Sequence, residues 1–410
     1  MPPILKSTSS FVVEMYDIHD YHKRVESAKR RLRSLPYSEL LLDFIDHLQA
    51  LGLSKGRIAK YANHLCTLFK ACPFDPRHAS RKSVERVIAW IESQPYKTST
   101  KDDLRLVVRK VVQYAKCGSC AKKTPVPPEV AWFSVRSRDD KDSRVRPESL
   151  LTIDEVKAMM AAAENERDRA MISILFEAAL RPSELLSMKV GSVSFNSQYC
   201  LITAVGKTGL KRIPLVASFK PLLEWLQKHP LKGDVNAPLW VALGNNSKNG
   251  KVSYYYLRKL IKKLAEKAGV KKDVWPYLFR HTTLTNLAKV FTESRLEHFA
   301  GWVQGSRMAR RYVHFSARDI EDAVLELHGI RKKDETDGVL RAVECPRCRE
   351  RNSPDSVRCS FCGYILDARL AFETEEKRVE RLEDILKRLE RLEQMVYSFL
   401  GGKGEPLQQQ

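Results

Sequence analysis

Residues 276–288 read PYLFRHTTLTNLA, and this stretch places Arg280 at the start of an apolar helix. Tyr277 lies three residues before that arginine. A second arginine stands upstream in residues 179–186, ALRPSELL, where Arg181 follows an apolar helix and Glu184 comes one helical turn later. Two arginines, each set at the edge of an apolar helix, are the first candidates for a functional site.

Three further motifs accompany these two arginines along the chain. Residues 205–215, VGKTGLKRIPL, form a strand–turn–strand pattern that puts Lys207 on a β-turn. Trp302 follows a glycine in AGW, and Tyr312 comes ten residues later in the basic segment SRMARRYVHF. Taken singly, each of these residues is usually a surface or core residue, so only their ordered combination carries weight.

The five motifs suit the cleavage and resealing of a phosphodiester. A tyrosine phenol, here Tyr312, can attack phosphorus and keep the phosphoryl group, which conserves the energy of the bond. The guanidinium groups of Arg181 and Arg280 would stabilise the charge on the non-bridging oxygens. Lys207 would protonate the leaving 5′ oxygen. The indole of Trp302 only donates, so it can hold a phosphate oxygen but cannot shuttle protons. This chemistry needs neither a metal nor ATP.

This ordered set resembles the catalytic domain of tyrosine recombinases, the phage-integrase family, over residues 148–330. Residues 37–116 are similar, more weakly, to the core-binding domain of that family. The resemblance implies that Arg181 and Arg280 clamp phosphate, that Lys207 is the hairpin lysine, that Trp302 holds the His/Trp position, and that Tyr312 is the nucleophile. It also implies a tetramer on paired sites. The family usually has His or Lys where this chain has Tyr277, so the general acid/base role of that position is open.

The net charge of +21 and the isoelectric point near 9.6 make a polyanion the expected partner. The excess lies in two blocks, +11 over residues 51–150 and +12 over residues 201–300, whereas residues 301–410 are neutral. Two basic blocks favour a clamp that grips double-stranded DNA from two sides. An ordinary solvated basic surface is the alternative.

The chain is expected to be mostly α, with a small antiparallel β-hairpin sheet. Apolar spacing predicts helices over residues 37–51, from Ser54 to Ala71, over residues 83–93 and from residue 99 or 100 to 115. Thr152 is the expected N-cap of the helix that opens the catalytic domain. The predicted divisions are an N-terminal extension (1–34), a helical DNA-clamp domain (35–118), a linker (119–147), the catalytic domain (148–332), a zinc ribbon (340–366), a coiled-coil helix (367–400) and a tail (401–410).

Four cysteines near the C-terminus have the spacing of a metal site. Cys345, Cys348, Cys359 and Cys362 follow the pattern C-x2-C-x10-C-x2-C, which can close one tetrahedral zinc site. One structural zinc ion is therefore expected, and no cofactor for catalysis. The pair Cys117 and Cys120 stands alone and is interpreted as two free thiols, with a redox pair or half a metal site as alternatives.

The last helix carries a heptad seam. Its apolar residues alternate at intervals of three and four, with charges between them, and are Leu382, Ile385, Leu389, Leu392, Val396 and Phe399. This spacing is typical of a short coiled coil and predicts a homo-oligomer. A lone helix packed back on the body is the alternative.

These features predict a site-specific DNA recombinase that works through a 3′-phosphotyrosine, as an integrase of a mobile element. The segment from Tyr312 onward, YVHFSARDIEDAVLELHGI, resembles archaeal members most. The rivals are a type IB topoisomerase-like nickase and a catalytically impaired DNA-binding regulator. The sequence shows neither a membrane span nor a signal peptide, so a cytoplasmic, nucleoid-associated protein is expected. His281 and His314 are interpreted as structural.

Overall fold

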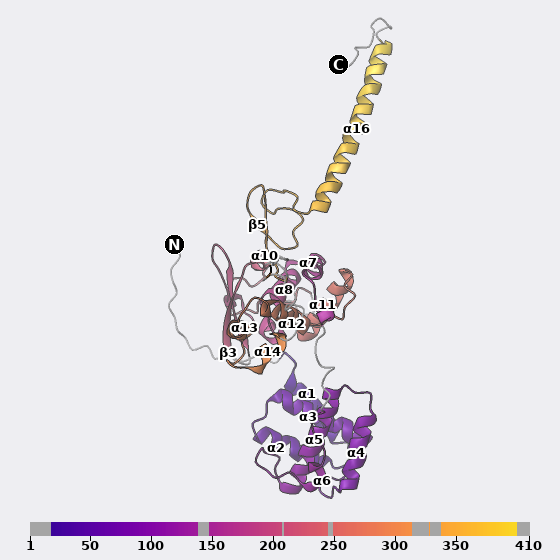
Figure 1. Ribbon diagram of the computed structural model, residues 1–410, viewed down its shortest axis with the longest axis vertical. Helices are drawn as coiled ribbons and strands as arrows, with labels where there is room; N and C mark the ends of the chain where they lie inside the picture. Colours follow the sequence, from indigo (N-terminus) through magenta and orange to yellow (C-terminus); the bar gives the residue numbers. More distant parts are fainter. Residues whose placement is uncertain are drawn as a thin grey trace. The chain divides into compact units, whose positions relative to one another are not determined.

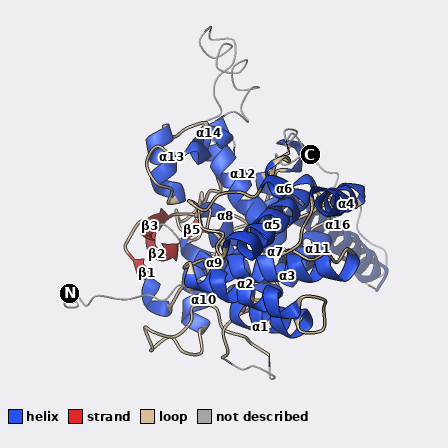
Figure 2. Cartoon of the chain, turned by 90° about the horizontal axis from the view of Figure 1, so that it is seen from below, coloured by secondary structure: helices blue, strands red, loops and turns tan. Residues whose placement is uncertain are grey.

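The computed structural model describes residues 18–137, 147–206, 209–244, 249–313, 328 and 338–399. Over these ranges the chain is mostly helical with small antiparallel sheets, which confirms the predicted fold class (Figures 1 and 2). Contacts divide the chain into two compact units, one spanning Tyr16–Arg146 and the other including Pro147–Gln410. Each unit is described by itself below.

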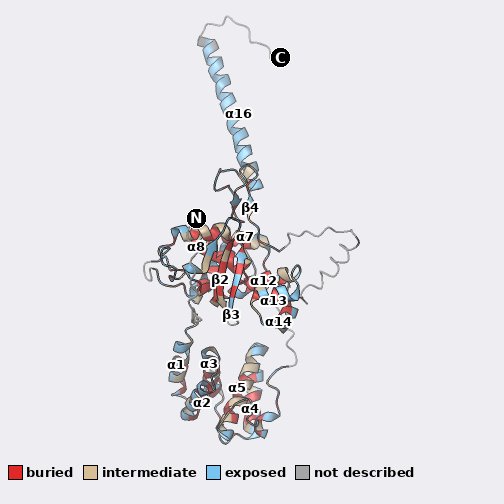
Figure 3. Cartoon of the chain, turned by 90° about the vertical axis from the view of Figure 1, so that its left-hand side faces the viewer, coloured by how far each residue is buried: buried red, intermediate tan, exposed pale blue. Residues whose placement is uncertain are grey.

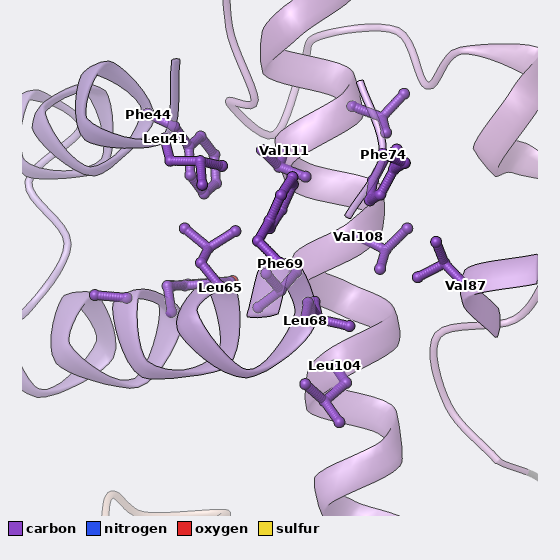
Figure 4. Packing of buried hydrophobic residues seen from close by; sticks show 14 of the residues in the cluster. Leu41, Phe44, Leu65, Leu68, Phe69, Phe74, Val87, Leu104, Val108 and Val111 are labelled. Atoms are coloured by element: carbon purple, nitrogen blue, oxygen red, sulfur yellow. The ribbon is translucent and has the colours of Figure 1, made fainter. Parts of the chain in front are cut away.

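The first unit is a helical domain with one apolar core. Leu65, Leu68 and Phe69 of α3 face Val108 and Val111 of α5 in this core (Figure 4). Its helices are α1 (Tyr21–Leu32), α2 (Ser38–Ala50), α3 (Lys55–Ala71), α4 (Arg81–Ser93), α5 (Thr98–Cys117) and α6 (Pro128–Ala131).

The four helices predicted here are confirmed, with different caps. Ser54 precedes α3 as expected, but its side chain makes no capping hydrogen bond. The predicted start of the next helix at Ser83 is too late, because Ser80 caps α4 and Ser83 returns a hydrogen bond to the Ser80 backbone. α5 begins at Thr98 and ends at Cys117, and its C-cap is Gly118, which has a φ of 69° that favours glycine.

Two parts of the first unit were not predicted as structure. α1 lies in the expected N-terminal extension, yet its Ala28 and Leu32 are fully buried. This segment is highly charged and has only about one apolar residue per helical turn. The helical periodicity of its apolar residues is therefore weak. The first half of the expected linker also packs on this unit, through buried Val130 and Phe133.

The second unit surrounds a three-stranded antiparallel meander with helices. Thr152 caps its first helix in a capping box with Glu155, as predicted. The apolar helix expected before Arg181 is also present, as α8. The elements are α7 (Ile153–Ala161), α8 (Glu166–Glu177), α9 (Pro182–Leu186), β1 (Val193–Phe195), β2 (Cys200–Gly206), β3 (Gly209–Leu215), α10 (Phe219–Lys228), α11 (Tyr254–Lys267), α12 (Pro276–Ala288), α13 (Glu293–Ala300) and α14 (Arg307–Val313).

The hairpin register places one lysine on the buried face of the sheet. β2 and β3 pair from Cys200 and Leu215 to Gly206 and Gly209. Lys211 alternates with Ile213 and Leu215, and all three are buried. Side chains on this face of β3 therefore point into the second unit.

The end of α8 is fixed by a buried carboxylate. Glu177 accepts hydrogen bonds from the backbone N–H groups of Val216, Ala217 and Ser218, at 2.7, 3.0 and 2.7 Å. Burial raises the pKa of Glu177, and these donors oppose that effect. The contact ties the exit of β3 to the segment that leads to Arg181.

The C-terminal part holds a small two-stranded sheet and a long helix. β4 (Val343–Glu344) pairs with β5 (Arg351–Asn352), and α16 spans Ala368–Phe399. The described seam residues of α16 are 45–56% exposed, and Figure 3 shows the helix exposed along its length. No helix in the described ranges combines the length and apolar character needed to cross a membrane.

Candidate active site

Arg280 is buried at the centre of the second unit. Its side chain lies on α12, and the residue is 3% exposed. The guanidinium donates to the carbonyl oxygens of Ala179 and Ala300, at 2.6 and 2.8 Å. Ala179 has a positive φ of 47°, which turns the chain sharply after α8. Each of these two guanidinium nitrogens keeps a second hydrogen for a ligand.

A buried carboxylate links Arg280 to the other predicted arginine. Glu184 lies on α9 and its side chain is fully buried. It pairs with Arg181 at 2.5 Å and lies 3.9 Å from Arg280. Glu184 also accepts from the backbone N–H of Arg181 at 2.8 Å, and this holds Arg181 at the start of the helix. The two arginines are therefore oriented by one shared anion.

Lys211 is a third cation at the same carboxylate. Its Nζ lies 2.9 Å from Glu184, and its side chain is 8% exposed. Burial lowers the pKa of Lys211 to about 8, with Glu184 raising it and Arg280 lowering it. The sequence motif drew attention to Lys207 instead, which lies outside the described residues. The sequence pattern that could have identified Lys211 is its two-residue alternation with Ile213, which places both side chains on the buried face of β3.

The cluster carries more positive than negative charge. Burial raises the pKa of Glu184, but Lys211 and Arg181 outweigh it and leave that pKa below its usual value. Burial lowers the pKa of Arg280 to about 10, with Arg181 lowering it further and Glu184 raising it. Arg280 thus stays protonated at neutral pH. Three cations around one carboxylate leave a buried excess of positive charge, which suits a phosphate.

Tyr312 lies against this cluster with its ring between two others. The residue is on α14 and is 3% exposed. Trp302 stacks on it with ring centroids 5.4 Å apart, and His281 stacks at 5.9 Å. The Tyr312 hydroxyl lies 2.9 Å from Nδ1 of His281. The Arg280 guanidinium sits over the Trp302 ring at 5.6 Å. The arrangement holds a phenol beside a buried guanidinium.

The structure brings together most of the predicted site. Arg181, Arg280, Trp302 and Tyr312 meet in one place, although they lie up to 131 positions apart in the sequence. Tyr277 is 41% exposed at the start of α12, one turn before His281. His281 is interpreted from the sequence as structural, yet it contacts the Tyr312 hydroxyl. His314 lies outside the described residues.

The four predicted metal ligands converge in a second site. The sulfur atoms of Cys345, Cys348, Cys359 and Cys362 all lie within 4.8 Å of one another. Two pairs are 3.6 and 3.5 Å apart. Four thiolates around one zinc would stand about 3.8 Å apart, given Zn–S bonds of roughly 2.3 Å. The cluster fits a tetrahedral metal, and it is the one such group found among the described residues.

The backbone around these cysteines forms two matching turns. Arg349 donates its N–H to the carbonyl of Cys345, and Gly363 donates to that of Cys359. Both residues have positive φ, 60° and 71°. Asn352 donates to the Cys359 sulfur at 3.6 Å, an additional contact that orients a ligand. The loops are thus shaped to aim two thiols each at one point.

Ion pairs join the cysteine module to α8 and α10 of the same unit. Arg169 of α8 pairs with Asp355 at 2.7 Å, and the Asp355 side chain is 1% exposed. Lys220 pairs with Glu350 at 3.6 Å. The other CxxC pair differs, because Cys117 is exposed and Cys120 is buried.

Comparisons with known proteins agree with this geometry. Residues 149–318 match the phage integrase family. Tyrosine recombinase XerA of Pyrococcus horikoshii is 26% identical over 259 residues, which cover 63% of this chain and 83% of that protein. A tyrosine recombinase of Synechococcus elongatus is 32% identical over 126 residues, covering 30% of this chain and 39% of its own.

Solved structures show the same fold. XerH recombinase bound to a palindromic difH substrate matches with a TM-score of 0.53 and 16% identity, over 75% of this chain and 97% of that one. A lambda integrase dimer bound to a core site matches with a TM-score of 0.51 and 15% identity. The match covers 68% of this chain and 96% of that one. Residues 149–318 therefore form a phage integrase family domain, and the chain that carries them is a homologue of the tyrosine recombinases.

Proposed function

We propose that this protein is a site-specific recombinase that cleaves and rejoins double-stranded DNA through a 3′-phosphotyrosine on Tyr312. The observation that carries the proposal is the buried Tyr312, whose ring packs on the same Trp302 indole as the guanidinium of Arg280, a member of the cluster of excess positive charge. The DNA-bound recombinases among the structural neighbours support a DNA substrate. A DNA substrate in turn favours action at the nucleoid, and the similarity to the XerA recombinase of Pyrococcus horikoshii favours an archaeal type of integrase, which we assign to a mobile element.

Each member of the cluster has a distinct task in the proposed reaction. Arg181 and Arg280 bind the non-bridging oxygens of the scissile phosphate and stabilise the transition state. The Trp302 indole borders the ring of Tyr312 and is a donor for a phosphate oxygen. Lys207 protonates the departing 5′ oxygen. The basic helical unit, with its eleven excess positive charges over residues 51–150, grips the flanking duplex.

The experiment that tests this function uses supercoiled plasmid and a two-site DNA substrate. Recombinant products and a protein–DNA adduct are expected. Relaxation of the plasmid without exchange would point to a topoisomerase-like nickase, and binding without an adduct would point to a regulator. Both of these outcomes contradict the proposal.

Tyr277 is expected to have a small role. Its side chain is 41% exposed and its phenol is a poor base at neutral pH, so it can only donate a hydrogen bond. Tyr277→Phe should slow single-turnover cleavage by less than about tenfold, the value of one hydrogen bond. Tyr277→His should match or exceed the wild type. A Tyr277→Phe protein with no measurable cleavage would contradict this role.

We also propose that the four-cysteine site holds a structural zinc ion and that α16 joins protomers into a tetramer on paired sites. A small four-thiolate module depends on its metal to fold. The module is fixed to the second unit through Arg169 and Asp355, so α16 extends from an anchored base. Leu382 and Leu389 at a, with Ile385 and Leu392 at d, present an exposed apolar seam suited to self-association.

Disrupting this tail should weaken the pairing of sites and spare cleavage. Leu389→Glu in the full chain should reduce recombinant product from a two-site substrate by at least about tenfold, because burying one unpaired charge costs several kcal/mol. Cleavage of a single site should stay within about twofold of the wild type. Gln394→Glu, on the opposite face of α16, is the matched control. Chelating zinc should mimic Leu389→Glu, and loss of single-site binding would show instead that the tail grips DNA.

A further inference from the structure

We infer that His281 accepts the proton of Tyr312 during strand cleavage, an inference that rests on the proposed function. The imidazole is the group that touches the reacting oxygen: its Nδ1 lies 2.9 Å from the Tyr312 hydroxyl. A general base must lie about 2.6–3.2 Å from the oxygen whose proton it takes. His281 meets this condition.

The surroundings of the pair hold its geometry. The rings of His281 and Tyr312 are inclined by only 27°, and Trp302 stacks on the tyrosine at 22°. His281 follows Arg280 directly on α12, so the base and the phosphate-binding guanidinium belong to one rigid helix. α14, which carries the nucleophile, packs against α12 through the cluster of Tyr312, Ala309 and Leu284. The base, the guanidinium and the nucleophile therefore come from two helices that pack against each other.

Other described groups near the hydroxyl are less suited to the task. Arg280 is a cation at neutral pH and cannot accept a proton, and its positive charge favours the negative charge that develops on the Tyr312 oxygen as it loses its proton. Tyr277 is exposed at the start of the helix, and a phenol is a poor base at neutral pH. A neutral imidazole with its hydrogen on Nε2 presents a lone pair at Nδ1 to the Tyr312 hydroxyl. His281 stands four residues after Tyr277. The imidazole proposed as the base therefore lies one helical turn beyond Tyr277 on α12.

The proposed step balances in atoms and charge. The Tyr312 oxygen forms a bond to phosphorus as the bond from phosphorus to the 5′ oxygen breaks. The phenol proton moves to Nδ1 of His281, which becomes an imidazolium. The 5′ oxygen takes a proton from a separate acid, for which Lys207 is proposed, and leaves as a hydroxyl. In the resealing step the 5′ hydroxyl gives its proton back to that group as its oxygen attacks phosphorus, and the imidazolium returns its proton to the departing tyrosine oxygen.

Single-turnover cleavage of a suicide DNA substrate by full-length protein tests this role. His281→Asn keeps a hydrogen-bond acceptor near the position of Nδ1 but cannot hold a proton, and His281→Ala leaves space for added imidazole. Both variants should lose about 10²–10⁴-fold in cleavage rate, the usual contribution of a general base. Imidazole should restore cleavage to His281→Ala and have no effect on His281→Asn. The exposed histidine of α13, His298, provides the matched control, His298→Asn.

A DNA substrate with sulfur at the 5′ bridging position separates the two proton transfers. A thiolate leaves without being protonated, so such a substrate restores variants that lack the acid. It should not restore the His281 variants, because their defect lies on the nucleophile. The inference is overturned if His281→Asn cleaves within about threefold of the wild type, or if the bridging sulfur restores its rate. Failure of the wild-type protein to form an adduct would instead overturn the proposed function itself.

Discussion

Tyr312→Phe should bind DNA with the affinity of the wild type and form no covalent adduct. Phenylalanine keeps the ring that stacks between Trp302 and His281, so the packing of α14 is retained. It lacks the oxygen that would attack phosphorus, and nothing else on the ring can replace it. Losing the hydrogen bond to His281 should cost only about 0.5–1.5 kcal/mol in the free energy of unfolding. The adduct is measured on a denaturing gel after reaction with a suicide substrate.

A matched control removes the same hydroxyl from another tyrosine. Tyr255 is 67% exposed on α11, and Tyr255→Phe should form the adduct at the wild-type rate. An adduct that persists in Tyr312→Phe would show that a different residue attacks the phosphate. Because the loss expected for Tyr312→Phe is complete, a partial decrease would also contradict its assignment as the nucleophile.

The ordered motifs were enough to find the residues that converge in space. Arg181, Arg280, Trp302 and Tyr312 each sit in a local pattern that fixes a helix end or a turn. Their contacts follow from that local structure once α8, α12 and α14 pack together. The four-cysteine site could also be predicted from the sequence, because each CxxC pair constrains the conformation of its own loop.

Lys211 and His281, which contact the predicted site residues, are marked by weaker sequence patterns. Lys211 resembles a solvated strand lysine until the register of β2 and β3 turns it inward. His281 follows Arg280 in an apolar helix, and only the position of α14 shows that it faces Tyr312. The only local signal for Lys211 is its two-residue alternation with Ile213. The contact of His281 depends on the packing of segments far apart in the sequence, which no local pattern contains. The contact of Arg169 with Asp355, 186 positions away, is of the same kind.

Glu184→Ala should destabilise the second unit more than a typical core substitution does. The carboxylate is fully buried and pairs with Arg181 and Lys211, so its removal leaves buried cations without a counter-charge. Breaking a buried ion pair by removing one partner costs about 3–5 kcal/mol in the free energy of unfolding. Urea unfolding of the full chain, followed by tryptophan fluorescence, measures this loss.

A second substitution separates the stability of this cluster from its chemistry. Lys211→Met in the Glu184→Ala background removes one unpaired cation and should recover part of the lost free energy, because an apolar side chain of similar length suits the buried position. It should not recover cleavage, since Arg181 still lacks both the salt bridge and the backbone hydrogen bond that hold it against α9. Wild-type stability in Glu184→Ala would show that the carboxylate does not organise the cations. Recovery of cleavage in the double variant would show that Arg181 functions without its contacts to Glu184.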